Sequence, residues 1–547
     1  MNKRIVAILS MALVIVTLNA QQNFTLSGSV QSDVLFPQDD DKIGTESTDD
    51  WGLTNTYADL HLRSRWVDAG ARLEFMEYPL PGFENDFQGW GVPHIYVKGK
   101  FGKGWELTLG DFYDQFGSGF IFRTYEERSL GIDNSLRGAR LNVSALDGLN
   151  MKLLGGVQRC YWDWDDAAII GGADAELNID RFSSSMQDKG ITWMVGASFV
   201  AKQEEDEDIL VGPVHKLNLP EVVTAFDLRS RFQKGNYSFL AEYAMKSQDP
   251  SFDNDYIYRK GNALMLSGSY SKRGMSALVQ VKRSEDMSFR SRRSMTGTSA
   301  FLNHMPAFAY QHTYALAALY PYATQMADGE WAFQGEFAYT FKRKTPLGGK
   351  YGTSLKLNIS HIRSIERTPL EGTTKLMGTD GYETSFFKMG DETYYQDINL
   401  QLEKKLSPSL KINLMYMNQH YNQLVIEGHG ELMTSNIFVG EGKYQFNKKL
   451  TLRGELQYLT TSSDQGDWAY GLLELSVLPS LMFTVSDMWN VGETDLHYYM
   501  GSVTYNYKSH RIMAGYGRTR AGYNCSGGVC RFVPASKGVN ISYNYSF

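Results

Sequence analysis

The sequence predicts an all-β protein, a transmembrane antiparallel up-and-down β-barrel of about 24 strands, within a range of about 22 to 26. Three observations predict this fold. The chain ends in an alternating strand, its first twenty residues have the pattern of a secretion signal, and short connections between alternating segments take turns with long polar ones. Single-chain outer-membrane barrels combine these features. We also expect some external loops to fold inward or to cap the barrel.

The closing strand of the predicted barrel runs from Gly538 to Phe547. Small polar residues alternate there with apolar or aromatic ones, which are Val539, Ile541, Tyr543, Tyr545 and Phe547. Alternation of period two places these five side chains on one face, where a barrel meets lipid. Tyr543, Tyr545 and Phe547 would lie at the membrane–water interface. We predict that they form the signal recognised by the barrel-insertion machinery.

The first twenty residues have the three parts of a secretory signal peptide. Lys3 and Arg4 give a positive start, an apolar run follows over 5–16, and Ala20 is a small residue suited to cleavage. After Ala20, no stretch approaches the roughly 18–20 consecutive apolar residues of a membrane-spanning helix. The predicted organisation is therefore a signal peptide over 1–20 and a single barrel domain over 21–547.

The composition suits a barrel. Hydrophobic residues make up 42 % of the chain but are spread in alternation, and aromatic residues make up 13 %, with 33 Tyr and 29 Phe beside 52 Gly. Barrels use aromatic residues at both membrane interfaces, and Gly relieves crowding at bends of a sheet. A formal net charge of −7 is small for 547 residues and argues against a nucleic-acid partner.

Alternating segments recur through most of the mature chain and are the predicted strands. The clearest are Phe24 to Val34, Thr56 to Trp66, Val67 to Phe75, Pro93 to Phe101, Trp105 to Phe112, Ser135 to Leu146, Leu149 to Tyr161, Glu330 to Lys342 and Leu450 to Tyr458. Short connections such as 102–104, 147–148 and 447–448 read as tight turns. Long polar connections alternate with them, at Pro37 to Asn55, Glu77 to Val92, Lys202 to Pro220, Asp249 to Lys260, Ile365 to Gly390 and Ala521 to Ser536.

The up-and-down order can be checked, because both termini of such a barrel lie on one side of the membrane and the strand number must be even. A strand at Ala307 to Tyr320 would put later short turns on the wrong side. The order is restored if Asp286 to Gly329 is one long external insertion and Gly172 to Phe182 is a strand. Within the insertion, His312 to Tyr320 is then expected to form a short helix or an inward fold.

Two of the three cysteines bracket a short flexible loop, at Cys525 and Cys530. In an oxidising envelope we predict a disulfide between them. The alternative is a metal site, although no His or second Cys pair lies nearby in the sequence. Cys160 is left over and is interpreted as an inert thiol at a strand end.

Charged side chains opposite the apolar faces are expected to line the lumen, because a charge against lipid near the midplane costs roughly 2–4 kcal/mol. The candidate lumen-lining residues are Asp59, His61, Arg63, Arg65, Arg72, Glu74, Arg140, Asp227, Arg229, Arg231, Arg453 and Glu455. One interpretation is a charged wall that selects solutes. The other is a ladder of paired charges that fills the lumen, and it is favoured because Asp and Glu stand beside Arg throughout.

Three acidic clusters could hold a divalent cation, namely Glu204 to Asp208, Asp39 to Asp41, and the trio Asp163, Asp165 and Asp166. Their spacing does not match an EF-hand loop, so solvated surface loops are the preferred interpretation. We predict no metal and no cofactor.

The histidines do not fall into a local catalytic motif. Five of them, scattered among Ser and Asp, are His304, His312, His361, His420 and His429. A catalytic triad can be assembled in space from distant residues, so a membrane-embedded hydrolase stays an alternative. The chain is predicted not to be an enzyme, and no catalytic residue is assigned.

The segment from Gly110 to Gly138 is the least ordinary part of the chain. It clusters Arg, Glu, Tyr and Gly, and the candidate residues of a constriction loop are Arg123, Tyr125, Glu126, Glu127, Arg128, Asp133 and Asn134. Such a composition suits a loop folded into the barrel mouth, where hydrogen bonds replace bulk water. An external loop held by its own salt bridges is the equal alternative.

This segment resembles an uncharacterised family of Bacteroidetes outer-membrane β-barrel proteins. The similarity extends to the stretches His312 to Leu316 and Tyr320 to Gln325, and to the ending Cys525 to Cys530 with Arg531, Val533 and Pro534. It covers nearly the whole mature chain and implies a barrel at a Gram-negative cell surface. It brings no substrate and no functional residue. No TonB box or separate plug domain is recognised before the first strand, which disfavours a TonB-dependent receptor.

The predicted function is a porin-like channel or transporter for a hydrophilic or amphipathic solute. The alternative is a non-conducting surface or envelope-assembly component that docks other proteins through its external loops. Expected partners are outer-membrane lipid and lipopolysaccharide, the barrel-insertion machinery and, for the alternative, envelope proteins. We expect an integral outer-membrane protein with both termini in the periplasm.

Overall fold

The computed structural model describes residues 24–47, 52–164 and 168–547, which form one closed antiparallel barrel of 24 strands. Each strand pairs with its neighbour along the chain, and the last, β32 (Ser536–Ser546), pairs with the first, β1 (Phe24–Pro37). The predicted fold class and the strand number of 24 are confirmed. The predicted signal peptide lies outside the described residues.

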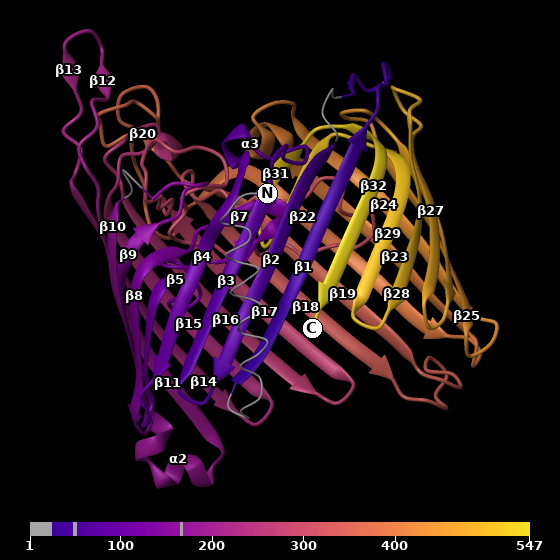
Figure 1. The fold of residues 1–547 in the computed structure, drawn as a ribbon, viewed down its shortest axis with the longest axis horizontal. Coiled ribbons are helices and arrows are strands. Elements are labelled where there is room, and N and C mark those ends of the chain that lie inside the picture. The colour runs from indigo at the N-terminus through magenta and orange to yellow at the C-terminus, as the bar shows by residue number, and fades with distance from the viewer. Residues whose placement is uncertain (1–23, 48–51, 165–167) are drawn as a thin grey trace.

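Between β1 and β32 the wall consists of strands of 8 to 17 residues (Figure 1). They are β2 (Leu53–Ser64), β3 (Val67–Met76), β4 (Gly89–Lys100), β5 (Trp105–Phe112), β8 (Leu136–Leu146), β9 (Leu149–Gln158), β10 (Ile169–Asn178), β11 (Ile191–Gln203), β14 (Val222–Lys234), β15 (Tyr237–Gln248), β16 (Lys260–Lys272), β17 (Met275–Glu285), β18 (Glu330–Phe341), β19 (Thr353–Ile365), β22 (Met389–Lys405), β23 (Leu410–Asn422), β24 (Leu432–Gln445), β25 (Leu450–Thr461), β26 (Trp468–Val477), β27 (Leu481–Asn490), β28 (His497–Tyr507) and β29 (His510–Thr519).

The connections carry the remaining elements of the described chain. Short strand pairs are β6 (Glu126–Glu127) with β7 (Ile132–Asp133), β12 (Leu210–Val211) with β13 (His215–Lys216), β20 (Thr368–Pro369) with β21 (Tyr382–Glu383), and β30 (Gly522–Ser526) with β31 (Val529–Val533). The helices are η2 (Asn85–Phe87), η3 (Arg128–Leu130), η4 (Ile179–Phe182), η5 (Phe252–Asn254), α2 (Ser184–Asp188) and α3 (Gln423–Glu427).

The outer face of the wall is apolar. Because side chains alternate along each strand, the residues between the inward-facing ones point outward, and Leu228, Val279 and Leu456 are strongly exposed there. Within the described residues, closure of the 24-stranded sheet leaves none of its strands with an unpaired edge, which is a requirement for crossing lipid with strands. The combination of a closed wall and an apolar outer face makes this a transmembrane barrel.

Within the described residues, none of the helices is both long enough and apolar enough to cross a membrane.

The two ends of the barrel differ. At one end, here called the short-turn end, most connections are brief, such as 65–66, 147–148 and 508–509. At the opposite long-loop end lie 113–135, 286–329 and the other long connections that the sequence predicts. Two connections at the short-turn end are longer than expected, 179–190 with α2 and 342–352. The hairpin β12–β13 and helix α2 mark the two ends (Figure 1).

Two sequence predictions were needed to keep the up-and-down order of the strands, and the structure tests both. The insertion Asp286 to Gly329 coincides with the connection between β17 and β18. The predicted strand Gly172 to Phe182 is shifted, because β10 covers Ile169–Asn178 and helix η4 takes the last four residues. The Asp180 carboxylate accepts a hydrogen bond from the Trp193 backbone N–H at 3.0 Å, which holds the chain in a turn at that point.

The seam between the first and last strands is closed at its tip by two residues. The backbone groups of Phe547 and Gly28 exchange two hydrogen bonds of 3.0 and 3.2 Å. The Phe547 ring also covers Gly28, since a Cβ added there would lie 2.7 Å from the ring. Gly28 therefore provides the space that the terminal aromatic side chain occupies.

Candidate functional site

The long-loop half of the lumen is filled by two connections, 113–135 and 286–329, here called the plug. Each segment accepts a hydrogen bond from the other at one of its backbone carbonyl groups. The Asn303 amide donates to the Phe120 carbonyl at 2.9 Å, and the Arg123 N–H donates to the Leu302 carbonyl at 2.8 Å. The segment 113–135 thus folds into the barrel mouth, and the alternative of an external loop held only by its own salt bridges is wrong.

An apolar core joins the plug to much of the wall. Phe116, Phe120 and Phe122 of the first segment and Leu302, Phe308 and Leu316 of the second are all at most 2 % exposed. Their cluster reaches inward-facing wall residues on two sides, including Leu154, Val200 and Ala263 on β9 to β16, and Met417, Ile437 and Leu459 on β23 to β25. Full burial of such a side chain stabilises a fold by about 1.5–3 kcal/mol. The plug is therefore an integral part of the folded barrel.

The stretch His312 to Tyr320 is an inward fold without a helix. The Tyr314 hydroxyl donates a hydrogen bond to Glu441 on β24 at 3.0 Å, and the Leu316 N–H donates to Gln457 on β25 at 2.8 Å. The imidazole of His312 lies 2.6 Å from the Asp397 carboxylate on β22. These contacts attach the second plug segment to the wall beyond its apolar core.

The hairpin β30–β31 packs on the plug from the long-loop end. Its Gly528 carbonyl accepts a hydrogen bond from the Thr324 N–H at 2.9 Å, and Arg531 pairs with Glu84 at 2.7 Å. The predicted disulfide between Cys525 and Cys530 is present and joins the two strands of this hairpin. Cys160 is left without a disulfide partner, as predicted, and its thiol is buried.

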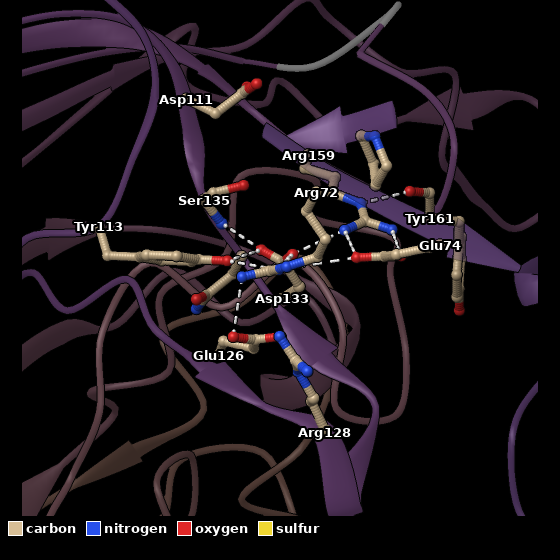
Figure 2. A network of polar contacts seen from close by, with 12 residues as sticks. Arg72, Glu74, Asp111, Tyr113, Glu126, Arg128, Asp133, Ser135, Arg159 and Tyr161 are labelled. Carbon is tan, nitrogen blue, oxygen red and sulfur yellow. Dashed lines mark hydrogen bonds and ion pairs between the residues drawn. The ribbon is translucent and has the colours of Figure 1, made fainter. Parts of the chain in front are cut away.

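On the side of β2 to β4, ion pairs replace the apolar core (Figure 2). The Arg72 guanidinium on β3 lies 2.8 Å from Asp59 on β2, and 2.9 and 3.0 Å from Glu126 and Asp133 of the plug. Arg128 of the plug reaches back to Asp59 at 2.7 Å. Two wall residues and three plug residues therefore form one continuous network.

Arg159, just past the end of β9, extends this network. It pairs with Glu74 on β3 at 2.7 Å and with Asp133 at 2.6 Å (Figure 2). The Tyr113 hydroxyl donates to the same Asp133 carboxylate at 2.8 Å. Burial would raise the pKa of Asp133, but the Arg159 and Arg72 guanidinium groups and the Tyr113 hydrogen bond lower it to about 2. Asp133 is therefore a carboxylate over the whole physiological range.

A second polar contact lies on another part of the wall, at β10 to β15. Ser118, at the tip of the first plug segment, donates from its hydroxyl to Glu242 on β15 at 2.6 Å. Beside it, Arg229 on β14 pairs with Asp227 at 2.9 Å and with Asp174 on β10 at 2.5 Å. The predicted lumen residues Asp227 and Arg229 thus lie next to the plug tip. Arg231, two residues further along β14, is exposed toward the short-turn end.

The other predicted residues are placed as follows. Arg453 and Glu455 pair with each other on β25, close to the plug contact at Gln457. Arg65 lies past the end of β2 in the link 65–66, where its guanidinium covers the Trp66 ring. That strand ends one residue earlier, because the Ser64 hydroxyl accepts a hydrogen bond from the Val67 N–H at 2.9 Å and forms a turn.

The remaining constriction-loop residues hold the first plug segment in shape. Arg123 covers the ring of Tyr125, and the Tyr125 N–H donates to the Asn134 side chain at 2.6 Å. Asn134 in turn donates to the Phe301 carbonyl at 2.7 Å. Glu127 accepts a hydrogen bond from the Ser129 hydroxyl at 2.7 Å and another from Ser526 of the hairpin at 3.4 Å.

Below this network, toward the short-turn end, the lumen contains a cavity of about 440 Å³. Its roof consists of Arg72 and the plug residues Tyr113, Glu126 and Arg128. The wall residues His61, Arg63, His94, Tyr96, Lys98 and Arg140 line its sides. The sequence analysis missed His94, Tyr96 and Lys98, although they alternate along β4 as the lumen residues of β2 do. Parity along the strand could have identified them.

The acidic clusters form ordinary ion pairs where the structure describes them. Lys216 bridges Asp206 and Asp208 at 2.9 and 2.8 Å, and Asp40 pairs with Arg518 at 2.5 Å. Asp165 and Asp166 lie outside the described residues. Among the residues that are described, no three or more His, Cys, Asp or Glu side chains form a group that could hold a metal ion.

Comparisons with known proteins place the chain in a family. A family model described as "Family of unknown function (DUF6029)" matches residues 1–547. No curated protein matches the sequence. Among solved structures, the siderophore receptor PirA from Pseudomonas aeruginosa is 10 % identical, with 95 % of this chain and 80 % of that chain covered and a TM-score of 0.42.

Two further solved structures are similar at the same level. The P pilus usher (PapC) translocation pore is 10 % identical, with 95 % and 99 % of the two chains covered and a TM-score of 0.43. OccAB4 of Acinetobacter baumannii is 10 % identical, with 97 % and 99 % covered and a TM-score of 0.33. Similarity this low does not assign a substrate or an activity.

Proposed function

The chain therefore belongs to the family of unknown function DUF6029, and we propose that it is a gated outer-membrane channel or transporter for a hydrophilic or amphipathic solute. The observation that carries the proposal is the cavity of about 440 Å³ between the charged wall of β2 to β5 and the plug. Ligand sites commonly have volumes of about 300–1,000 Å³. A solute entering from the short-turn end would meet this cavity directly below the plug.

The proposed gate is the face of segment 113–135 that contacts β2 and β3. This face is attached by the ion pairs of Arg72 and Arg128, whereas the other side of segment 113–135 and the second plug segment share a buried apolar core with the wall. Water in the cavity can solvate separated charges, but it cannot replace apolar contacts. Opening along the ionic face therefore costs less than extraction of the whole plug.

Planar-bilayer conductance tests this proposal. We compare the purified mature protein with a variant in which a Gly-Ser linker replaces residues 114–133 and both flanking strands are kept. The wild type is expected to conduct weakly or intermittently, and the deletion should give a larger, steady conductance and pass bigger solutes. A deletion of residues 206–219, which removes the hairpin β12–β13 outside the lumen, is the matched control. Equal conductance of all three proteins would contradict the gate.

A second candidate function is a non-conducting surface or envelope-assembly component. The extensive apolar core between the plug and the wall supports it, because such a core keeps a barrel closed. The long connections at the long-loop end would then dock envelope proteins. A barrel that stays silent after the 114–133 deletion, and that co-purifies with fixed partners, would favour this function.

The location follows from the same proposal. Both described ends of the barrel, Phe24 and Phe547, lie at the short-turn end, and we propose that this end faces the periplasm. The long-loop end would then meet lipopolysaccharide and the medium. Cleavage of the predicted signal peptide, insertion through the C-terminal strand and a Bacteroidetes source stay predictions. Protease added to intact cells should cut the β12–β13 hairpin and spare α2 if this orientation is right.

A further inference from the structure

The cavity lies beside a row of the wall that carries almost no side chains. Across β3, β4, β5 and β8 the paired residues are Gly70, Tyr96, Gly110 and Gly138. Tyr96 is the single side chain of this row, and its ring covers Gly70, where an added Cβ would lie 2.5 Å away. The cavity is a hollow between the charged rows above and below this row.

All charged side chains in the row above the hollow are paired. Each of its carboxylates, Asp59 and Glu126, pairs with both Arg72 and Arg128. Arg72, Glu126 and Arg128 belong to the roof described above, and Asp59 lines the cavity beside them. A ligand in the cavity would gain little by competing with them, because all four charges are already paired.

The row below the hollow has more cations than carboxylates. Asp68 on β3 is shared by Lys98 and Lys100 at 3.4 and 2.7 Å. Lys98 also approaches Glu106, at 3.7 Å. Asp114 of the plug is shared by Arg140 on β8 and Lys152 on β9, at 3.2 and 2.7 Å. These four cations face three carboxylates.

Arg63 adds a fifth cation to the row below the hollow. It lines the cavity at the end of β2, and among the described residues none forms a hydrogen bond or ion pair with its guanidinium. Two polar nitrogen atoms nearby also have no partner. The Arg140 Nε and the His94 Nδ1 are buried without a hydrogen-bond partner among the described residues, and His94 is 7 % exposed.

The cavity also offers apolar and aromatic surface. His94 stacks on Tyr113 with ring centroids 5.1 Å apart, and Phe112 lines the cavity beside Tyr96. We propose that this cavity binds a small organic anion. Its carboxylate or phosphate group would lie against Arg63 and Arg140, and its flat or apolar body would lie against Tyr96 and the His94–Tyr113 pair. That this anion is also the transported solute rests on the proposed channel function.

Guanidinium groups recognise carboxylate and phosphate through paired hydrogen bonds, which are stronger when both partners are charged. Titration calorimetry of the full-length mature barrel in detergent tests the chemistry with four matched probes: benzoate, phenyl phosphate, benzamide and benzylammonium. Benzoate or phenyl phosphate should bind at least about tenfold more tightly than the other two. The stronger of the two anions identifies the preferred head group. Equal binding of all four, or binding of none, overturns the proposal.

Variants locate the site. Arg63→Gln and Arg140→Gln should each weaken anion binding by about tenfold, the loss of one charged hydrogen-bonding partner. Asp68→Asn should strengthen it, because two lysines lose their shared carboxylate. Arg343→Gln, in the exposed connection 342–352, is the matched control and should have no effect. The change in gel mobility on heating, which is typical of folded barrels, shows whether each variant is folded. The comparison of the four probes on the wild type does not depend on any variant.

The site and the channel fail in different ways. Anion binding in a protein that does not conduct keeps the site and refutes the proposed transport. Conductance with no preference for anions, and unchanged by Arg63→Gln, keeps the channel and refutes the site. High salt should weaken the binding of the anion, since exposed charges such as Arg63 are screened.

Discussion

The guanidinium of Arg72 on the barrel wall lies 3.0 Å from the carboxylate of Asp133 on the plug. The side chains of both residues are largely buried, and the same guanidinium holds Asp59 and Glu126 as well. Removing one partner of a buried ion pair costs about 3–5 kcal/mol, because the other charges are left without compensation. This contact is the central attachment of the first plug segment to the wall.

Arg72→Met should therefore loosen segment 113–135 without unfolding the barrel. Hydrogen-exchange mass spectrometry should detect faster exchange in that segment and in β3, and unchanged exchange in β24 to β26. Arg72→Lys keeps the charge but cannot contact three carboxylates in one plane, so it should give an intermediate result. If segment 113–135 exchanged as slowly in Arg72→Met as in the wild type, the apolar core alone would be holding it in place.

The disulfide of the β30–β31 hairpin should have a local effect. It closes a loop of a few residues, for which loop-closure arguments give a stabilisation of roughly 2 kcal/mol. Replacing Cys525 and Cys530 by Ser should speed hydrogen exchange over 522–533 and at the Thr324 contact. Exchange in β27 and β28 is the internal control and should not change.

Thiol labelling tests the same bridge directly. Burial raises the pKa of the Cys160 thiol, so this residue should react only after denaturation. The denatured, unreduced protein should be labelled at Cys160 alone, and at three positions after reduction. Three labels without reduction would reject the disulfide.

Two buried groups of the second plug segment should respond to pH with opposite signs. Burial, with help from the charge of Arg123, lowers the pKa of His304 to about 3 from its ordinary value near 6.5. Unfolded protein then binds this proton first, so stability is lost as pH falls below about 6.5. Burial raises the pKa of Asp286 to about 7, so folded protein holds that proton more tightly and loses stability as pH rises from about 4 to 7.

Urea unfolding followed by tryptophan fluorescence between pH 4 and pH 7 separates the two groups. Relative to wild type, His304→Gln should become progressively more stable as the pH is lowered. Asp286→Asn should become progressively more stable as the pH is raised. Differences between variant and wild type that do not change with pH would show that neither group titrates in the folded plug.

The terminal strand should be required for insertion. Phe547 pairs with Gly28, and Tyr545 stacks on His510 of β29 with ring centroids 4.4 Å apart. Replacing Tyr543, Tyr545 and Phe547 by Ser removes this outward aromatic face, and the protein should accumulate in the periplasm or be degraded. Replacing Tyr237 and Tyr270, an aromatic pair at the same end of β15 and β16, is the control. Normal outer-membrane levels of the triple variant would contradict the predicted signal.

Much of the wall could be predicted because the information is local. Alternation of period two assigns each residue of a strand to lipid or lumen without reference to any other strand. It placed Arg72 and Glu74 on the lumen side, and the even strand number then required the insertion at 286–329. The two strand ends that were placed wrongly also have local causes. The strand β2 ends at Ser64 and leaves Arg65 in a turn, and β10 ends before Ile179.

The pairing of the charges could not be predicted in the same way. Arg72 meets Asp59, 13 residues away, but also Glu126 and Asp133, 54 and 61 residues away, and Arg159 meets Glu74 across 85 residues. Sequence reasoning placed Arg63, Arg140 and Asp227 in the lumen but assigned no partners to the charges of the loop. Arg140 does pair with Asp114, but the partners of Glu126 and Arg128 are Arg72 and Asp59.

By itself, the sequence determined the barrel, its outward apolar face, the disulfide hairpin and the charged character of the lumen. Each of these follows from periodicity, spacing or the cost of a charge in lipid. Only the tertiary structure decided that segments 113–135 and 286–329 interlock inside the lumen, and that a cavity lies beneath them. Contacts between connections far apart in the chain depend on the register of many strands at once, which no local pattern encodes.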